Sequence, residues 1–576
     1  MPSVSSRPVA TLFSPSREKH RLLLLVVGSA LIFAAGIGMR ALWNPNEPVY
    51  GEGVREMMVR GDYFLPYVNG KIYSDKPIFY FWAMLASCRL AGGLSEAALR
   101  LPSVIGGVLS VLLIYRLGRR VFGIRAGFLA GAFLATSVMF WWHSQYIQMD
   151  QILSFLMTGA MALFFLARES ALRRKGTLLA TAGALMGLAF LTKGPVGLVV
   201  PTAAMGVYLL AVRDWRWVFR REVAWMAAAF LLAATPWYLS LALTGHGQVL
   251  TDFFIRHNLE RATDPFNHVQ PFWYYLPRLF SDLFPWSLFL PAAFFVPVRN
   301  EMERRGRLFA ALWFGVVFLL FSAAGSKRGV YLLPLYPAAA LLLGKFWDEV
   351  LSGEVSAFLK RWARGALAFL GAFLCAGFLA LAGVAAWAAR SGKYRAESPA
   401  LVPLALMGLA GGVAIFLFLR KRRLSAAVAG LTLAMAGIYL YADLFVLRLA
   451  DRYKSPVPFC EKVASAVGPG DEIRSYGLWR WDSSYLFYTE RLMPQIPSRE
   501  EADAYLAQDR RVFLLVESSD MDRFLADLRS PARVLVREEI GHKTTALLTN
   551  RAGDSSVLRD GRSDRPLPGG GDAGLL

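Results

Sequence analysis

The sequence predicts an all-α polytopic membrane domain followed by a small C-terminal α/β domain. Of the 576 residues, 55% are hydrophobic, and the mean hydropathy is +0.40. Apolar runs of membrane-spanning length recur as far as residue 446, and beyond about residue 448 the apolar runs become short and β-rich. A helix needs about 20 mostly apolar residues to cross a bilayer. This composition is typical of a membrane protein and not of several soluble domains.

Thirteen apolar runs have the length and composition of transmembrane helices. They cover 22–42, 101–117, 126–142, 150–167, 177–192, 195–212, 223–243, 281–298, 307–324, 329–345, 366–389, 401–419 and 424–446. The first run follows a basic leader, is long for the core of a signal peptide and has no small-residue cleavage site after it. We therefore interpret it as a retained first helix.

Basic clusters beside these runs predict the orientation of the chain. A net charge of +21 would favour nucleic acid as the partner of a soluble protein, but here clusters such as 116–125, 168–175 and 420–423 flank the spans. Lys and Arg favour the cytoplasmic side of a membrane. Every cluster falls on that side if the aromatic stretch 78–92 lies in the interface and does not span. We expect 13 spans, an inside N-terminus, an outside C-terminus, contact with membrane lipids and no nucleic-acid partner.

Two polar outer loops, 44–100 and 244–280, hold the candidate carboxylates and cations of a site. The first loop opens with W-N-P-N-E-P-V-Y-G-E-G-V-R-E-M at 43–57, which is unusually polar for a connector. Its Glu47 is a candidate catalytic base, or else a capping or turn residue. We expect Glu52 and Glu56 on the solvated side of a short helix. Asp150, at the outer start of a span, is the second candidate base, or else a carboxylate that the helix dipole stabilises.

Three cations of the outer face are suited to a lipid phosphate. Lys76 lies in S-D-K-P, Lys193 in L-T-K-G-P and Arg261 in R-H-N-L-E-R. The alternative is that these side chains snorkel at helix ends. An outer lysine runs against the positive-inside bias, so the context of Lys193 favours a functional role.

The outer loops do not require a cofactor, but they could hold a divalent metal ion. The loop 244–280 carries three of the six histidines, and His257 with Asp75 could bind such an ion. The spacing is not that of a compact metal-binding motif.

The C-terminal part is predicted to form a separate domain. Runs such as R-R-V-F-L-L-V and K-T-T-A-L-L-T alternate with helical stretches between 448 and 550. This alternation is typical of a small α/β domain. We place a transmembrane domain at 1–447, this outer domain at 448–550 and a disordered, Gly-rich tail at 551–576.

The motifs of the outer loops resemble, in order, those of the bacterial lipid A aminoarabinose transferases. They read E-P-V-Y-G-E-G-V-R-E-M, G-D-Y-F-L-P-Y-V-N-G-K-I-Y-S-D-K-P, L-T-K-G-P, P-W-Y, R-H-N-L-E-R, Q-P-F-W-Y-Y-L-P, F-P-W-S and S-K-R-G-V-Y-L-L-P-L-Y-P. With the protein O-mannosyltransferases, that family belongs to the GT-C glycosyltransferases. The resemblance covers about residues 40–345 and implies a GT-C fold.

The resemblance also implies a reaction and its binding residues. A sugar would leave a polyprenyl-phosphate carrier for lipid A, or for another envelope glycan or protein, on the periplasmic face of the bacterial inner membrane. Substrate-binding roles would fall on residues of the shared motifs, namely Asn46, Tyr50, Lys76, Lys193, His257, Arg261 and Tyr331. The family's Asp-Glu, Arg-Tyr and E-K-P read here as Asn46-Glu47, Val49-Tyr50 and Asp75-Lys76-Pro77.

Two other classes of function fit parts of the sequence. A transporter or flippase of the carrier lipid would show charges at mid-bilayer and an inverted repeat. The predicted spans have almost no central charges, and their number is odd. A binding protein without transferase activity is the second alternative, because Asn46 replaces an acid of the family pattern.

Overall fold

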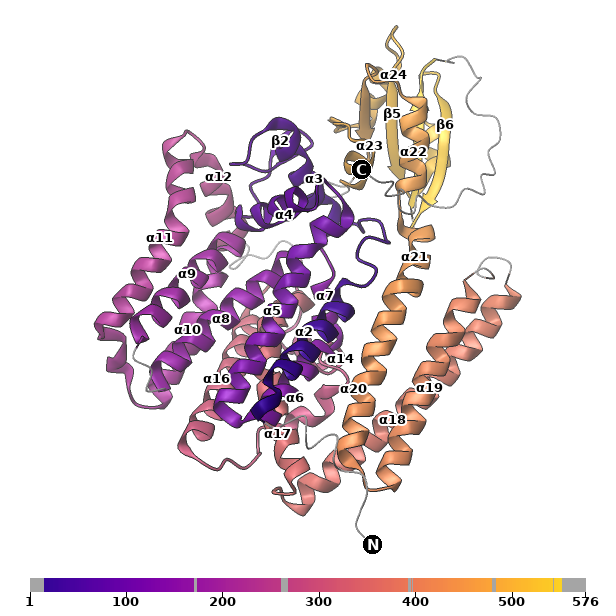
Figure 1. The fold of residues 1–576 in the computed structure, drawn as a ribbon. Coiled ribbons are helices and arrows are strands. Elements are labelled where there is room, and N and C mark those ends of the chain that lie inside the picture. The colour runs from indigo at the N-terminus through magenta and orange to yellow at the C-terminus, as the bar shows by residue number, and fades with distance from the viewer. Residues whose placement is uncertain are drawn as a thin grey trace, which may run out of the picture. The chain divides into compact units, whose positions relative to one another are not determined.

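The computed structural model describes residues 15–169, 174–260, 268–391, 395, 397–478, 483–541 and 543–551. The chain forms two compact units, whose elements are labelled in Figure 1. The first consists of residues 1–42 and 49–452, and the second of residues 43–48 and 453–576. The short segment 43–48 therefore belongs with the C-terminal part of the chain.

Nine helical segments in the described residues are long and apolar enough to cross a membrane. They are α5 (Glu96–Phe122), α8 (Met149–Glu169), α9 (Lys175–Lys193), α11 (Arg221–Leu243), α16 (Glu301–Ala323), η6 (Gly329–Leu335) continued by α17 (Tyr336–Ser352), α18 (Ala357–Arg390), α19 (Ser398–Arg420), and α20 (Leu424–Tyr441) continued by η7 (Ala442–Val446) and α21 (Leu447–Lys454). The pair α6 (Ile124–Ala135) and α7 (Val138–Ser144), bent by 67°, makes a tenth if it crosses as one span. The predicted polytopic all-α membrane fold is confirmed.

Shorter elements complete the first unit, apart from residues 46–48 of α3, which belong to the second. They are η1 (Pro15–Arg17), α2 (Glu18–Ala34), α3 (Asn46–Arg60), β1 (Tyr67–Val68), β2 (Lys71–Ile72), α4 (Phe79–Leu90), α10 (Val196–Ala211), η2 (Trp215–Phe219), α12 (Gly247–Thr251), η3 (Asp252–Glu260), η4 (Phe272–Tyr274), α14 (Tyr275–Asp282), η5 (Trp286–Phe289) and α15 (Leu290–Ala293). The strands β1 and β2 form an antiparallel hairpin between α3 and α4.

Among the described residues, nine or ten segments have the length and hydropathy of a membrane span, compared with the thirteen expected. The runs 22–42 and 195–212 form α2 and α10, of 17 and 16 residues, which are short for a straight span. The run 281–298 is not one helix but the end of α14, then η5 and α15. Pro285 and Pro291 interrupt it, because proline lacks the N–H that helix continuation requires. The aromatic stretch 78–92 was not counted among the thirteen. It forms α4, whose 12 residues are too few to cross a bilayer.

Glycines allow the close packing of α9 against α11. A Cβ on Gly183 would lie 1.9 Å from the backbone oxygen of Met226, and a Cβ on Gly187 would lie 2.6 Å from the Cβ of Ala233. Small residues at such positions let two membrane helices approach closely. This packing fixes the helix whose last residue is Lys193.

The second unit contains a five-stranded sheet in the order β4-β3-β5-β7-β6. Its elements are α22 (Val457–Ala466), β3 (Ile473–Tyr476), α23 (Ser484–Thr489), β4 (Gln495–Ile496), α24 (Arg499–Leu506), β5 (Phe513–Ser518), α25 (Met521–Ala526), β6 (Arg533–Ile540) and β7 (Lys543–Thr549). β3 pairs parallel with β4 and β5, whereas β7 pairs antiparallel with β5 and β6. The predicted α/β character of this region is confirmed. The predicted tail 551–576 lies outside the described residues, apart from Arg551.

The segment 43–48 is held by side-chain contacts within the second unit. The amide of Asn44 donates a hydrogen bond of 3.0 Å to the Ser484 hydroxyl. The Lys454 ammonium lies 4.7 Å from the centre of the Trp43 ring. These contacts fix the segment that carries Asn46 and Glu47.

Candidate functional site

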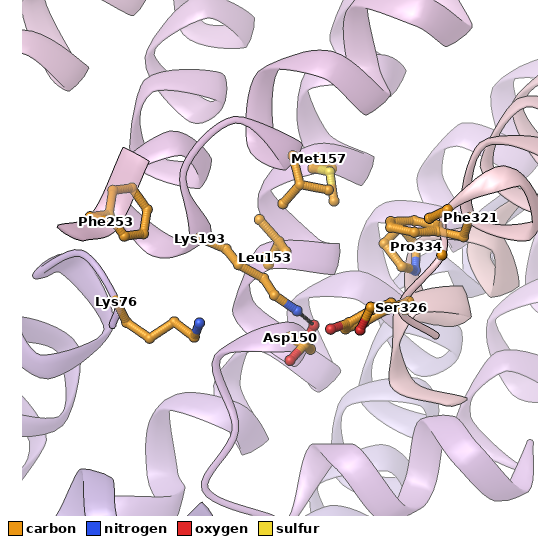
Figure 2. A pocket seen from close by; sticks show the side chains of 13 residues that line it. Lys76, Asp150, Leu153, Met157, Lys193, Phe253, Phe321, Ser326 and Pro334 are labelled. Atoms are coloured by element: carbon orange, nitrogen blue, oxygen red, sulfur yellow. Dashed lines mark hydrogen bonds and ion pairs between the residues drawn. The ribbon is translucent and has the colours of Figure 1, made fainter. Parts of the chain in front are cut away.

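A pocket of about 210 Å³ in the first unit collects several of the predicted site residues. Its walls are Lys76, Asp150, Leu153, Met157, Lys193, Val196, Phe253, Phe321, Ala324, Gly325, Ser326, Tyr331 and Pro334. Figure 2 shows the ion pair of Asp150 and Lys193 in the middle, with apolar side chains around it. Such a combination of an apolar lining and a few convergent polar groups is typical of ligand sites.

The acid of the pocket projects from the first turn of α8. Asp150, Leu153 and Met157 follow the spacing of one helix face, so α8 presents all three to the same cavity. Asp150 as a whole residue is 5% exposed. Its Oδ2 accepts a hydrogen bond of 3.2 Å from the Gln148 amide. Gln148 therefore helps to orient the carboxylate, a role that no motif of the sequence pointed to.

Lys193, the last residue of α9, forms the central ion pair of the pocket. Its Nζ lies 2.5 Å from Oδ1 of Asp150 and 4.6 Å from the centre of the Tyr331 ring. Tyr331 in turn packs on Phe321 at a centroid distance of 5.5 Å. A lysine held between a carboxylate and an aromatic face has a fixed position. Lys193 is thus built into the pocket and is not a snorkelling residue at a helix end.

Lys76 reaches into the pocket from the loop between β2 and α4. Its side chain extends toward the ion pair of Asp150 and Lys193, and its ammonium points into the cavity (Figure 2). The preceding Asp75 is buried, with 5% of its surface exposed. The structure therefore brings together four residues that the sequence predicted for the site: Lys76, Asp150, Lys193 and Tyr331.

Tyr50 lies in a buried aromatic cluster close to the charges of the pocket. Its ring packs edge-on against Tyr80 at 5.8 Å and Tyr73 at 6.4 Å. Burial raises the pKa of the Tyr50 hydroxyl well above its usual range, and the negative charges of Asp150 and Asp75 raise it further. The phenol is therefore a neutral hydrogen-bond donor at physiological pH.

Glu47 and Asn46 belong to the other unit of the structure. Glu47 is fully buried, and its Oε2 accepts a hydrogen bond of 3.0 Å from the backbone N–H of Trp43. All residues of the pocket come from the first unit. The hydrogen bond from Trp43 indicates that Glu47 stabilises the backbone at the start of α3.

The expectation that Glu52 and Glu56 face solvent is wrong. Their exposed fractions are 0% and 3%. Both oxygens of Glu52 accept hydrogen bonds of 2.7 Å from Arg55, and Glu56 accepts from the backbone N–H of Gly70 at 3.1 Å. Burial raises the pKa of Glu52 to about 7, although Arg55 opposes the shift. Helix α3 is buried on more sides than a short surface helix would be. Glu52 and Glu56 are therefore buried and have hydrogen-bond partners.

The remaining predicted site residues are not placed in the pocket. His257 falls in η3, but its side chain is not described, and Arg261 lies outside the described residues. Within the described ranges, no group of three or more His, Cys, Asp and Glu side chains is arranged to hold a metal ion. Because the His257 side chain is not described, the divalent metal at Asp75 and His257 stays a prediction.

Comparison with known proteins connects this geometry to a family. The chain is 30% identical over 385 residues to the undecaprenyl phosphate-alpha-4-amino-4-deoxy-L-arabinose arabinosyl transferase of Aeromonas salmonicida, covering 66% of this chain and 69% of that relative. The chain belongs to this arabinosyl transferase family. It is also 32% identical over 332 residues to the transferase of the same name from Edwardsiella ictaluri, where it spans 60% of the relative's length.

The family assignment agrees with the pocket residues and with the fold. The family described as dolichyl-phosphate-mannose-protein mannosyltransferase matches residues 75–239, a range that includes Lys76, Asp150 and Lys193. The crystal structure of ArnT from Cupriavidus metallidurans has a similar fold, with a TM-score of 0.79 at 23% identity, covering 93% of this chain and 99% of that one. The predicted GT-C fold is confirmed.

Proposed function

We propose that this chain is a membrane glycosyltransferase that moves a sugar from a polyprenyl-phosphate carrier to an acceptor outside the membrane. The observation that carries the proposal is the convergence of Lys76, Asp150 and Lys193 in one largely apolar pocket. The relatives support the donor class, because they are named for an undecaprenyl phosphate-linked aminoarabinose, and ArnT of Cupriavidus metallidurans is bound to undecaprenyl phosphate in its crystal structure.

The proposed reaction breaks the bond between the anomeric carbon and the carrier phosphate. The electron pair of that bond stays on the phosphate oxygen, and the acceptor oxygen forms the new bond to carbon. Cations fixed beside the leaving oxygen stabilise the developing negative charge, and they do so more strongly in a water-poor site. Lys76, whose ammonium points into the pocket, is the residue we assign to this role, with Lys193 beside it.

The surroundings of Asp150 favour an acceptor that needs little base catalysis. One oxygen of Asp150 is bonded to Lys193 and the other to Gln148, so a proton from an incoming hydroxyl would compete with these bonds. A phosphate acceptor, as on lipid A, is already an anion and brings no such proton. We therefore propose a phosphate acceptor such as lipid A, with Asp150 positioning Lys193. For a hydroxyl on another envelope glycan or protein, Asp150 or Glu47 would act as the base.

We place the reaction on the periplasmic face of the bacterial inner membrane. The basic clusters of the sequence predict that the loops around Lys76 and Lys193 lie on the outer side. A divalent metal bound by Asp75 and His257 stays a prediction, and no step of the proposed reaction depends on it.

Deletion of the protein in its host is the experiment that tests this function. The lipid A, the core saccharide and the other envelope glycans of deletion and parent strains would be compared by mass spectrometry. The proposal predicts the loss of one sugar residue, restored by the wild-type chain but not by a Lys76→Ala variant. Identical glycans in both strains, or full restoration by Lys76→Ala, would contradict it.

A further inference from the structure

The turn between α16 and η6 carries an arginine to which the reaction outlined above gives no role. Ser326 pairs with Val269 in an isolated antiparallel bridge, and the backbone N–H of Lys327 donates to the carbonyl of His268 at 2.9 Å. Arg328 follows with extended backbone angles, φ −131° and ψ 144°. Its carbonyl accepts the Tyr275 hydroxyl at 3.1 Å and the Tyr331 N–H at 3.0 Å. The backbone of Arg328 is thus fixed on both sides.

Arg328 is not one of the residues that line the pocket, but alternation along this segment places its side chain on the same face as Ser326. Residues two apart in extended backbone share a face, and Ser326 lines the pocket. Lys327, on the opposite face, bonds the carbonyls of Gln270 and Ala324 at 2.9 and 2.5 Å. The positive charge of Arg328 also acts on Tyr50 and lowers the pKa that burial has raised. The Arg328 side chain thus shares the face of the pocket residue Ser326, and its charge acts on Tyr50.

The guanidinium of Arg328 has hydrogen-bonding capacity that the described part of the chain does not use. Its side chain is half-buried, and none of the hydrogen bonds or ion pairs found among the described residues involves it. By contrast, Lys193 is paired with Asp150, and Lys327 is bonded to two carbonyls. A planar guanidinium offers five N–H donors in a geometry that matches two oxygens of a phosphate.

We propose that Arg328 binds a phosphate group of a substrate of this site. The inference rests on the proposed function and deepens it, because it gives a phosphate-binding role to a residue of the S-K-R-G-V-Y motif that had none. Two sources share this chemistry: the phosphate of the polyprenyl carrier and a phosphate of the acceptor. Lysine in place of arginine keeps the charge but loses the two-pronged geometry.

The test uses the purified full-length chain in detergent, with Arg328→Gln, Arg328→Lys and the control Arg89→Gln. Arg89 is an exposed arginine of α4, over the Tyr63 ring at 4.3 Å. One measurement is the affinity for polyprenyl monophosphate without sugar, followed by native mass spectrometry. The other is the KM for a phosphorylated lipid acceptor at saturating donor. Thermal midpoints check that each variant is folded.

If Arg328 binds the carrier, Arg328→Gln weakens carrier binding roughly 10- to 100-fold, the range expected for hydrogen bonds to a charged group. If it binds the acceptor, carrier affinity is unchanged and the KM rises by a similar factor. In both cases Arg328→Lys is intermediate and Arg89→Gln matches wild type. A folded Arg328→Gln protein with wild-type values in both measurements overturns the inference. Failure of the wild-type chain to bind the carrier or to transfer sugar would instead show that the proposed function is wrong.

Discussion

Nζ of Lys193 lies 2.5 Å from Oδ1 of Asp150, which joins the end of α9 to the start of α8. The side chains are 18% and 7% exposed, so the pair is largely shielded from solvent. Removing one partner leaves the other charge poorly compensated, whereas removing both does not. We expect Asp150→Asn and Lys193→Gln each to destabilise the protein by roughly 1–3 kcal/mol, less than for a fully buried pair. The double variant should lose less than the sum.

Thermal midpoints of the four proteins in detergent measure this coupling. The exposed pair of Glu301 and Arg304, at 2.7 Å on α16, is a matched control and should show much weaker coupling. Simple additivity for Asp150 and Lys193 would show that the pair contributes nothing to the folded state.

Lys76 should be far more important for turnover than for folding. Its ammonium points into the pocket, where it would meet the charge of the leaving phosphate. Loss of such a contact costs about 10²–10³ in rate. We expect this loss in Lys76→Met, with an unchanged thermal midpoint and partial activity in Lys76→Arg. Lys71→Met, which removes an exposed lysine of β2 in the same loop, should retain wild-type turnover. Wild-type kinetics of Lys76→Met would remove Lys76 from the reaction.

Replacement of Glu47 should distinguish between the two kinds of acceptor. The amide oxygen of Gln can still accept the Trp43 N–H that Glu47 binds at 3.0 Å, so Glu47→Gln should fold normally. With a phosphate acceptor we expect transfer within about tenfold of wild type, because little base catalysis is needed. Asn46→Asp, which restores the family pattern, should be tolerated. Abolished transfer in a folded Glu47→Gln protein would assign the base to Glu47 and a hydroxyl to the acceptor.

The raised pKa of Glu52 predicts a pH-dependent stability. Burial raises this pKa from its usual 4.5 to about 7, so the folded state holds a proton that the unfolded state releases. The resulting stabilisation is fully present below pH 4.5 and is lost as the pH rises through about 7. The thermal midpoint should therefore fall over this interval, and less steeply in Glu52→Gln. A pH profile of Glu52→Gln identical to that of the wild type would contradict the shift.

The contact between Asn44 and Ser484 should protect the start of α3. The hydrogen bond of 3.0 Å ties the segment 43–48 to helix α23 of the second unit. Asn44→Ala and Ser484→Ala should speed amide hydrogen exchange in residues 46–50 with little effect on the strands of the sheet. Ser465→Ala, which removes an exposed hydroxyl of α22 bonded only to its own helix, is the control. Unchanged exchange in the first turn of α3 would show that the contact does not stabilise it.

The sequence predicted best the features that depend on a single local property, such as hydropathy. Length and hydropathy predicted the long helices, and the local β-rich pattern predicted the sheet of the second unit. The run 281–298 shows the limit of hydropathy, because Pro285 and Pro291 divide a stretch that is apolar enough to span. The sequence also did not show which residues of the outer loops are buried. The burial of Glu52, for example, depends on other elements that pack around α3.

Four residues of the pocket were predicted from the sequence, but their arrangement was not. The predicted outer position of Lys193 and the motif around Lys76 drew attention to both lysines. The pairing of Lys193 with Asp150 spans 43 positions of sequence and follows from the packing of α8 against α9, which no local pattern encodes. For the same reason Gln148 was missed, because only the position of its amide beside Asp150 reveals its role.

The most direct test of the central claim is the release of polyprenyl phosphate from a polyprenyl-phosphate-linked sugar by the purified protein in the presence of outer-envelope lipid. Mass spectrometry would follow both the freed carrier and the glycosylated acceptor. The account predicts equal amounts of the two products with the wild-type chain and a loss of about 10²-fold or more with Lys76→Met. Product formation by Lys76→Met at the wild-type rate would show that the chemistry takes place somewhere other than the pocket of Lys76, Asp150 and Lys193.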